Sequence, residues 1–351
     1  MTALSTMRTL TDAFPTPFAV IDARRTIVAA NQAMRDVLGE DIVDRHYTRA
    51  CRRPSILDAV ERAFGVGALE EAEFSETVKG RTSHFKVICS PLEVEGRAHV
   101  SLSFEDVTSS REIRAMRSDF VANVSHELKT PITSILGFVE TIQGPAANDE
   151  AARNRFLSLM AREAERMNRL VHDLLSLNRV EVDEKVRPMD RVALNALVSH
   201  TAEVLQPLAE ARDISLKIEL PDAPCHVTGH ERQLVQVLRN LAENAIAYSP
   251  SGNEVRVRLT APAYEVALHG NGVRLIIEDD GQGIDPVHIP RLTERFYRVD
   301  SHRSREVGGT GLGLAIVKHI ITRHRGRLEI KSKLGIGSRF TAILPADTSA
   351  P

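Results

Sequence analysis

The period of the apolar positions changes along the chain and divides it into regions. Between residues 8 and 108, apolar and polar residues alternate over short stretches, as they do in half-buried strands. The clearest of these stretches are residues 19–22, 26–29, 84–88 and 98–104, and the first two flank a turn. This pattern predicts a small antiparallel sheet with helices on one side.

From residue 108 to residue 179, the apolar residues follow a helical period. Steps of three and four residues form two runs with heptad spacing, which is typical of helices that pack along a narrow stripe. The first run is Val121, Val124, Leu128, Pro131, Ile135, Phe138 and Ile142, and the second is Leu157, Met160, Ala164, Met167, Val171 and Leu174. Residues 144–148, with two turn formers and a proline, separate the runs. We expect an antiparallel hairpin that dimerises into a four-helix bundle, with a helix pair packed inside one monomer as the alternative.

Residues 181–190 are charged and contain Pro188, which predicts a linker. Beyond them, strand-like stretches at 214–220, 255–259, 273–277, 328–330 and 340–344 surround helical patterns at 195–211, 231–247 and 313–324. The strands outnumber the helical crossovers between them, and residues 335–337 mark a hairpin. The sheet should therefore contain both parallel and antiparallel pairs, with helices on one face. The prediction is a multidomain α+β protein with domains at 8–108, 109–180 and 191–346.

Composition narrows the function and the location. Lys and Arg number 45 against 47 Asp and Glu, a net charge of −2, whereas nucleic-acid binding rests on a clustered basic excess. The three cysteines form no C-x-x-C pair, which favours buried thiols in a reducing compartment. No apolar run approaches the roughly 20 residues of a membrane span. We therefore expect a cytoplasmic protein that does not bind nucleic acid.

Two motifs in the C-terminal region carry oxygen ligands. Asn240 and Asn244 are four residues apart on a predicted helix, so both amides face the same side and can bind a phosphate-bound Mg²⁺. Asp279 follows the strand at 273–277, and Gly281 and Gly283 behind it permit close approach to the backbone. A carboxylate at Asp279 can accept a hydrogen bond from the amino group of adenine and would repel the oxygen of guanine.

A third motif consists of glycines before an apolar helix. Gly309, Thr310, Gly311, Leu312 and Gly313 stand where free backbone N–H groups and a helix N-terminus can hold phosphates. This spacing is neither a P-loop nor a dinucleotide-binding fingerprint. Five arginines precede the motif, at positions 291, 295, 298, 303 and 305, in a segment that can close over a polyphosphate as a lid.

The order of these motifs resembles the ATPase family shared by histidine kinases, gyrase-type topoisomerases, mismatch-repair ATPases and ATP-dependent chaperones, which implies an α/β sandwich domain. Residues 294–300 (Glu-Arg-Phe-Tyr-Arg-Val-Asp) resemble the lid of histidine kinases. Residues 120–131 (Phe-Val-Ala-Asn-Val-Ser-His-Glu-Leu-Lys-Thr-Pro), on the first heptad helix, resemble the phosphoacceptor box of that family.

The box supplies a nucleophile. His126 lies between two seam residues and should face solvent, and a neutral imidazole is nucleophilic at pH 7. Glu127 beside it can accept the Nδ1 proton, which leaves the Nε2 lone pair to attack the γ-phosphorus of ATP. Pro131 should bend the helix just after the site. The resemblance implies that Thr130, one turn from His126, positions a water that removes phosphate from the partner.

The family resemblance also implies roles in the nucleotide site. Asn244 would be the main Mg²⁺ ligand with Asn240 assisting, Tyr248 would line the pocket, and Arg298 and Arg295 would contact the terminal phosphates. The three glycines 309, 311 and 313 would shape the lid hinge. The partner would be a response regulator with a receiver domain, docked near residues 135–142 of a homodimer, and a membrane protein is a further candidate partner. The family often has a lysine where this chain has Ala247. Two outcomes stay open: loss of a phosphate contact lowers the ATP affinity, or the arginine-rich segment compensates for it.

The N-terminal region resembles a PAS domain. Asn31 follows the second strand as a helix-initiating residue, and residues 104–108 (Phe-Glu-Asp-Val-Thr) resemble the exit motif of that family. Residues 52–60 resemble phosphate-regulon sensor kinases, which implies phosphate-starvation signalling. Two other functions stay open: a clamp ATPase without a phosphoacceptor, against which His126 argues, and a scaffold or phosphatase with little kinase activity, which Ala247 keeps open.

Overall fold

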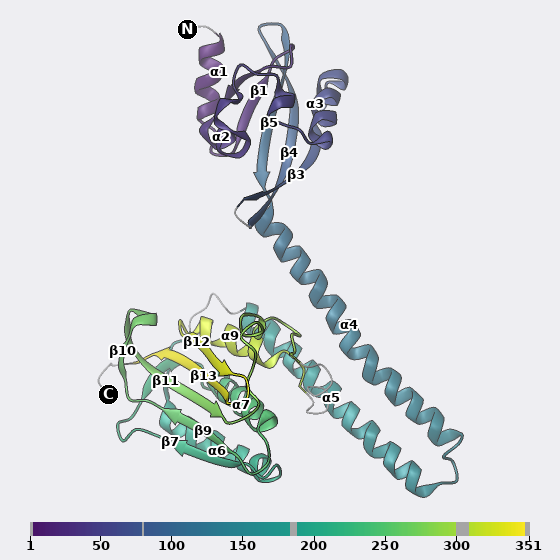
Figure 1. Cartoon of the computed structure of the whole chain (residues 1–351), viewed down its shortest axis with the longest axis vertical. Coiled ribbons are helices and arrows are strands. Elements are labelled where there is room, and N and C mark those ends of the chain that lie inside the picture. The colour runs from purple at the N-terminus through teal and green to yellow at the C-terminus, as the bar shows by residue number, and fades with distance from the viewer. Residues whose placement is uncertain (1–2, 79–80, 183–187, 300–308, 348–351) are drawn as a thin grey trace. The chain divides into compact units, whose positions relative to one another are not determined.

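A computed structural model describes residues 3–78, 81–182, 188–299 and 309–347 of the chain (Figure 1). The structure separates into two compact units, Met1–Ala122 and Asn123–Pro351. The long helix α4 (Thr108–Gln143) begins in the first unit and ends in the second. In the described part of the chain, no helix combines the length and the apolar character needed to cross a membrane.

The N-terminal unit is built on an antiparallel sheet, as predicted. Its strand order is β2-β1-β5-β4-β3, and all four pairings are antiparallel. The strands are β1 (Phe18–Ile21), β2 (Ile27–Ala30), β3 (Glu70–Val78), β4 (Arg81–Val94) and β5 (Arg97–Asp106), and the helices are α1 (Ala3–Asp12), α2 (Gln32–Leu38) and α3 (Pro54–Val66). Strand β3 is absent from the prediction, because its acidic residues obscure the apolar alternation of Ala72 and Phe74.

Asn31 organises the entry into α2, in agreement with the sequence. Its Oδ1 accepts hydrogen bonds from the N–H groups of Phe18 (3.0 Å) and Met34 (2.9 Å), and its Nδ2 donates to the carbonyls of Phe14 and Thr16. The side chain therefore caps the helix and ties it to the start of β1. Behind it, the apolar sides of α2 and α3 pack on the sheet in one buried core.

The start of α4 is tied to the sheet. The N–H of Val107 donates to the carbonyl of His84 (2.8 Å), and the N–H of His84 donates to Oγ1 of Thr108 (2.8 Å). Asp106 accepts a hydrogen bond from the N–H of Thr108 (2.8 Å), as an N-cap carboxylate does. An ion pair between Arg111 and Glu73 adds a contact one turn further along. The predicted exit motif is thus the joint between sheet and helix.

Helices α4 and α5 (Glu150–Val182) form the predicted hairpin, and the chain leaves the helical path at residues 144–149. Helix α4 continues through Pro131 to Gln143. The predicted linker at 181–190 is trimmed at both ends, because α5 extends through Val182 and β6 (Asp190–Ala193) begins at Asp190; residues 183–187 lie outside the described residues. Several large apolar side chains of the hairpin are exposed, namely Ile132, Leu136, Leu157, Val171 and Leu175.

The C-terminal sheet is mixed, as predicted, with the order β12-β13-β11-β9-β7 and β10 (Ala263–Glu265) added to β11. Only the pairing of β7 (Ser215–Glu219) with β9 (Glu254–Leu259) is parallel among the described strands. The other strands are β11 (Gly270–Asp279), β12 (Arg327–Lys333) and β13 (Gly337–Pro345), with helices α6 (Leu194–Glu210), α7 (Glu231–Tyr248) and α9 (Gly313–Arg323). A small pair of β6 with β8 (His226–Gly229) is absent from the prediction.

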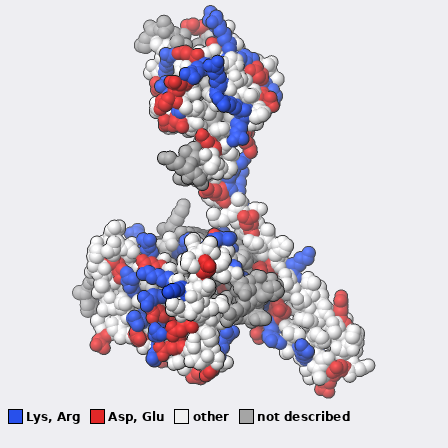
Figure 2. Space-filling view, viewed as in Figure 1, with Lys and Arg blue, Asp and Glu red and all other residues white. Residues whose placement is uncertain are grey.

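Alternation along β9 separates the two faces of this sheet. Val255, Val257 and Leu259 are buried toward the helices, whereas Arg256 and Arg258 lie on the other face. There Arg256 pairs with Glu254 (2.8 Å) and Asp280 (2.9 Å), and Figure 2 shows acidic and basic side chains intermixed over this part of the molecule. The helix-covered face is therefore the one that builds a core, and the end of β11 brings Asp279 to its rim.

Candidate active site

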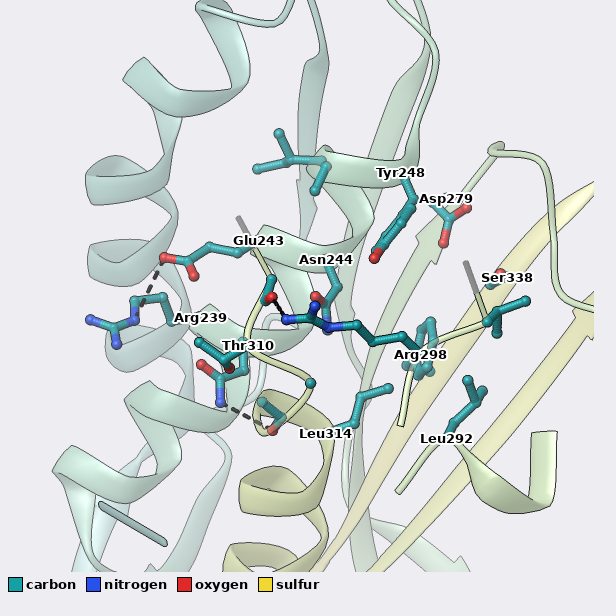
Figure 3. Close-up of a pocket in the computed structure, with 18 of the residues that line it drawn as sticks. Arg239, Glu243, Asn244, Tyr248, Asp279, Leu292, Arg298, Thr310, Leu314 and Ser338 are labelled. Carbon is teal, nitrogen blue, oxygen red and sulfur yellow. Dashed lines mark hydrogen bonds and ion pairs between the residues drawn. The ribbon is translucent and has the colours of Figure 1, made fainter. Parts of the chain in front are cut away.

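A cavity of about 600 Å³ opens in the C-terminal unit, between α5, α7 and the segment before α9 (Figure 3). Ten of the predicted site residues line it: Asn240, Asn244, Tyr248, Asp279, Gly283, Arg298, Gly309, Thr310, Gly311 and Gly313. Gly281, Arg295 and Leu312 are not among the described residues that line it. The three C-terminal motifs, which are far apart in the sequence, thus meet around one space.

Helix α7 presents one face to the cavity and the other to the core. Leu234, Leu238 and Leu241 are at most 2% exposed, so the helix is anchored along that side. Asn240 is 8% exposed, and its Nδ2 donates to the carbonyl of Gly313 (3.2 Å), which joins α7 to the start of α9. The Oδ1 atom of an amide accepts rather than donates, so this hydrogen bond leaves it available as an oxygen ligand.

Asp279 occupies the rim of the cavity at the end of β11. It is 7% exposed, and its Oδ1 accepts a hydrogen bond from the N–H of Gly281 (2.9 Å). Burial raises the pKa of this carboxyl to about 6, with the hydrogen bonds from the chain opposing the shift. At pH 7 the group is therefore an ionised acceptor that faces the cavity beside Tyr248 (Figure 3).

The two glycines after Asp279 permit close contacts within the chain. A Cβ at Gly281 would stand 2.7 Å from Oδ1 of Asp279 and 2.8 Å from the carbonyl oxygen of Tyr248. Gly283 has a φ of +68°, and a Cβ there would stand 2.0 Å from the carbonyl oxygen of Lys333. The predicted close approach is thus made by the protein itself, and it holds Asp279 against the end of α7.

The glycine-rich segment connects to α5 through Thr310. The Thr310 hydroxyl donates to Oδ2 of Asp173 (2.7 Å) and accepts from the N–H of Leu312 (3.2 Å). Leu312 itself is fully buried. The N–H of Phe296 donates to the carbonyl of Gly311 (2.9 Å), so the arginine-bearing segment and the glycine-rich segment lie against each other.

The structure describes three of the five arginines before the glycines, and they differ in where they lie. Arg298 lines the cavity and donates to the carbonyl of Gly309. Arg291 instead pairs with Glu294 (3.2 Å) and lies over the ring of Tyr297, 4.2 Å from its centroid. Arg295 lies outside the described cavity wall, and positions 303 and 305 lie outside the described residues. A single described arginine of the five therefore faces the predicted phosphate region.

The phosphoacceptor box lies on α4, with His126 exposed as predicted. His126 is not among the described residues that line the cavity. The carboxylate of Glu127 accepts a hydrogen bond from Arg166 of α5 (2.9 Å) and lies 3.7 Å from a guanidinium nitrogen of Arg298. Thr130 donates to the carbonyl of His126 (3.1 Å). Glu127 thus joins the box to the cavity through Arg298, and its action as a proton acceptor stays a prediction.

Other residues of the cavity wall were not found from the sequence. They include residues of α5 (Asn168, Arg169, His172 and Asp173), Leu208 of α6, Arg212 just after α6, and Arg239 and Glu243 of α7. Arg212 donates to the carbonyl of Ala247 (3.1 Å), so it places a cation beside the position where the family often has a lysine. The spacing of the four α5 residues on one helix face was the available sequence signal.

Comparison with known families agrees with this arrangement. Residues 229–348 match the family described as "Histidine kinase-, DNA gyrase B-, and HSP90-like ATPase". Residues 116–182 match the "His Kinase A (phospho-acceptor) domain", and residues 11–112 match the "PAS fold". Each of the three predicted types of domain is therefore present.

Individual relatives point the same way. The phosphate regulon sensor protein PhoR of Pseudomonas aeruginosa is 44% identical over 246 residues, 70% of this chain and 53% of that protein, so the chain spans about half its length. The sensor-like histidine kinase SenX3 of Mycobacterium tuberculosis is 33% identical over 334 residues, 95% of this chain and 78% of that protein.

A solved structure shares the fold. The histidine kinase ThkA, in complex with the response regulator protein TrrA, aligns with a TM-score of 0.53 at 19% identity over 97% of this chain and 98% of that chain. With a PAS fold, a phosphoacceptor hairpin and an ATPase domain in one chain, and a relative matched over most of its length, the chain belongs to the sensor histidine kinases of two-component systems.

Proposed function

We propose that this chain binds Mg-ATP, phosphorylates His126 and passes the phosphoryl group to an aspartate of a response regulator. The main support is the ion pair between the cavity wall and the phosphoacceptor box. Arg298 lines the cavity, and a guanidinium nitrogen of Arg298 lies 3.7 Å from the carboxylate of Glu127, the neighbour of His126. Phosphoryl transfer depends mostly on positioning and charge stabilisation. A guanidinium that contacts both the cavity and the box is suited to positioning the phosphate and to stabilising its charge.

The cavity wall supports a nucleotide site. Asp279 would accept a hydrogen bond from the adenine amino group, Tyr248 would lie against the nucleotide, and Arg298 would contact its terminal phosphates. No cluster of three or more His, Cys, Asp or Glu side chains among the described residues is arranged to hold a metal. The amide oxygens of Asn244 and Asn240 fit Mg²⁺, which takes few protein ligands and keeps waters and phosphate oxygens. When bound, Mg²⁺ would neutralise phosphate charge.

The reaction at His126 exchanges one bond to phosphorus for another. Nε2 forms the P–N bond while the bond from the γ-phosphorus to the bridging oxygen of ADP breaks, and the imidazole must then lose its Nδ1 proton. Glu127 is the nearest carboxylate in sequence, and it is engaged by Arg166 and Arg298. Contact of Arg298 with a phosphate would free Glu127 from one of these cations, which would make it a better proton acceptor.

The test is incubation of the full chain with γ-labelled ATP and Mg²⁺. We expect acid-labile, alkali-stable label that is lost in His126→Ala and kept in His200→Ala, a matched change at an exposed histidine of α6. Steady ATP hydrolysis without labelled protein would favour a clamp ATPase. Absence of both label and hydrolysis would favour a scaffold.

Phosphatase activity toward the regulator is a second proposal. It rests on Thr130, which is exposed one helical turn from His126 and whose hydroxyl donates to the backbone carbonyl of His126. Thr130→Ala should slow loss of phosphate from the labelled regulator while His126 still becomes labelled. Equal loss of both activities would indicate a disturbed helix instead.

Assembly as a homodimer is supported by the exposed apolar residues of the hairpin. Leu136 is 58% exposed and Leu157 is 50% exposed, which is costly unless another surface covers them. A four-helix bundle of two hairpins would bury them, and the regulator would dock near residues 135–142. Light scattering measures the assembly, and a monomer at micromolar concentration would contradict it.

Phosphate-starvation signalling in the cytoplasm is the most specific proposal. It is supported by the relative named as a phosphate regulon sensor, and the buried free thiols of Cys51, Cys89 and Cys225 fit a reducing compartment. Phosphotransfer profiling against the response regulators of the source organism would identify the partner, and cell fractionation would locate the chain. Transfer to a regulator unrelated to phosphate would overturn the assignment of the stimulus.

A further inference from the structure

Helix α5 of the hairpin forms one wall of the nucleotide cavity. Asn168, Arg169, His172 and Asp173 all line it, at positions that share a helix face. None of the motifs recognised in the sequence includes these residues. Since the same cavity contains the glycine-rich segment and Asp279, a molecule that fills it touches the hairpin and the ATP-binding domain together.

Asp173 makes the direct connection between the two. Its Oδ2 accepts the hydroxyl hydrogen of Thr310 (2.7 Å), and Thr310 is 9% exposed. The same hydroxyl accepts the N–H of Leu312, so it holds the turn that leads into α9. Burial raises the pKa of Asp173, so the group carries its charge at a cost in this position.

The charges around Asp173 are mixed. The neighbouring Arg239 and Arg169 lower the pKa of Asp173. Burial raises the pKa of Glu243, and the nearby charge of Asp173 raises it further. Arg239 also forms an ion pair with Glu243, with 3.6 Å between Nε of Arg239 and Oε1 of Glu243 (Figure 3). Two carboxylates therefore face a region that the glycine-rich segment and Arg298 make suitable for phosphates.

Resting on the proposed function, we infer that Asp173 is a positioning and specificity-determining residue: it holds the glycine-rich segment against α5 through Thr310, and its charge opposes the terminal phosphate of a nucleoside triphosphate. A diphosphate fits the docked arrangement, whereas a triphosphate binds at the expense of the Asp173–Thr310 contact. By linkage, docking on α5 weakens triphosphate binding by the same factor. His126 is not among the described residues that line the cavity, so transfer requires the nucleotide to be placed differently relative to α4. Loosening the Asp173–Thr310 contact permits that change and therefore also favours transfer.

The first test compares Asp173→Asn with the unchanged full chain by calorimetric titration with ADP and with a non-hydrolysable ATP analogue, each with Mg²⁺. Asparagine keeps the acceptor for Thr310 and removes the charge. We expect the preference for the triphosphate over ADP to rise about three- to tenfold. The matched control is Glu165→Gln, the same change at an exposed position of α5 outside the cavity wall, which should leave the ratio unchanged.

The outcomes separate this inference from the proposed function. A ratio in Asp173→Asn within twofold of the unchanged chain overturns the role of Asp173, while nucleotide binding itself stands. Absence of binding by the unchanged chain overturns the nucleotide site altogether. An equal shift in Glu165→Gln would assign the effect to the overall charge of the helix and would also overturn the inference.

A second variant distinguishes positioning from structural support. Asp173→Ala removes both the hydrogen bond and the charge, and we expect the KM for ATP to fall and kcat for labelling of His126 to stay or rise. A residue that only supports the fold would lower kcat and the melting temperature together. A fall in kcat at unchanged KM therefore overturns the inference.

Discussion

Helix α7 and the α4–α5 hairpin are both amphipathic, yet their apolar residues differ in burial. On α7, Leu234, Leu238 and Leu241 are at most 2% exposed, because the sheet and the neighbouring helices cover them. On the hairpin, Leu136 and Leu157 are at least half exposed. The nucleotide site therefore lies on a core whose apolar side chains are covered within one chain, whereas the phosphoacceptor lies on a hairpin whose apolar surface is partly exposed.

The largest expected effect follows directly from this difference. Leu241→Ala should lower the free energy of unfolding of the C-terminal domain by about 2–5 kcal/mol, because it leaves a cavity in a packed core. Leu136→Ala removes the same atoms from an exposed position and should change it by less than about 1 kcal/mol in the monomer. Denaturant unfolding monitored at low protein concentration measures both, and equal losses would contradict the comparison.

The next effect concerns binding at the rim of the cavity. Asp279→Asn should weaken binding of adenine nucleotides about 10- to 100-fold, since it replaces a charged acceptor with a group that donates toward the adenine amino group. Asp280→Asn is the matched control, because Asp280 is exposed and pairs with Arg256 instead. Loss of labelling without loss of nucleotide affinity in Asp279→Asn would place the residue in a different role.

The pH dependence sharpens the same point. Burial raises the pKa of Asp279 from 3.8 to about 6, so the fold loses stability as the pH rises between these two values, and the full cost of the ionised group is present above about 6. The ionised form is the one that accepts from adenine. ADP affinity should therefore be constant above pH 7 and fall as the pH drops through about 6, by up to roughly tenfold per unit. Affinity that rises on acidification would contradict this role of Asp279.

The smallest effect concerns Ala247. A lysine at this position would stand at the cavity wall near Arg212, whose contact to residue 247 is with the backbone carbonyl and survives the substitution. Ala247→Lys should strengthen ATP binding about two- to fivefold, the scale of one partly exposed charge pair. Ala261→Lys adds the same charge at an exposed position outside the cavity wall and should have no effect on the titration.

Elements with a strong local pattern were predictable from the sequence. Strand β9 alternates over its whole length, and α7 combines its period with a long uninterrupted run, so both were predicted closely. Strand β11 is mostly apolar only at its centre, and only that centre, residues 273–277, was predicted. Strands β3, β10, β6 and β8 were not predicted. The last two are four residues long and exist because they pair with each other across more than thirty positions of the chain. The local pattern of apolar and polar residues does not reveal pairing between segments that lie so far apart in the sequence.

The candidate site divides in the same way. Motif residues such as Asn244 and Asp279 were found because their spacing is characteristic. Asp173 was not, because its place in the cavity depends on how α5 packs. The predicted seam of α5 omits the buried apolar residues Leu170, Leu177 and Val180, which are at most 3% exposed. Helix α5 carries two apolar stripes, and a single heptad template identified the one that is left uncovered.

The joint at the start of α4 has a mechanical consequence. Val107, Thr108 and Asp106 are hydrogen-bonded to His84 or to one another at 2.8 Å, so the start of the helix is fastened to β4 and β5 by hydrogen bonds. Such a joint is a rigid connection rather than a hinge. A change in the tilt of β4 and β5 would therefore be transmitted to the first turn of α4 through these hydrogen bonds.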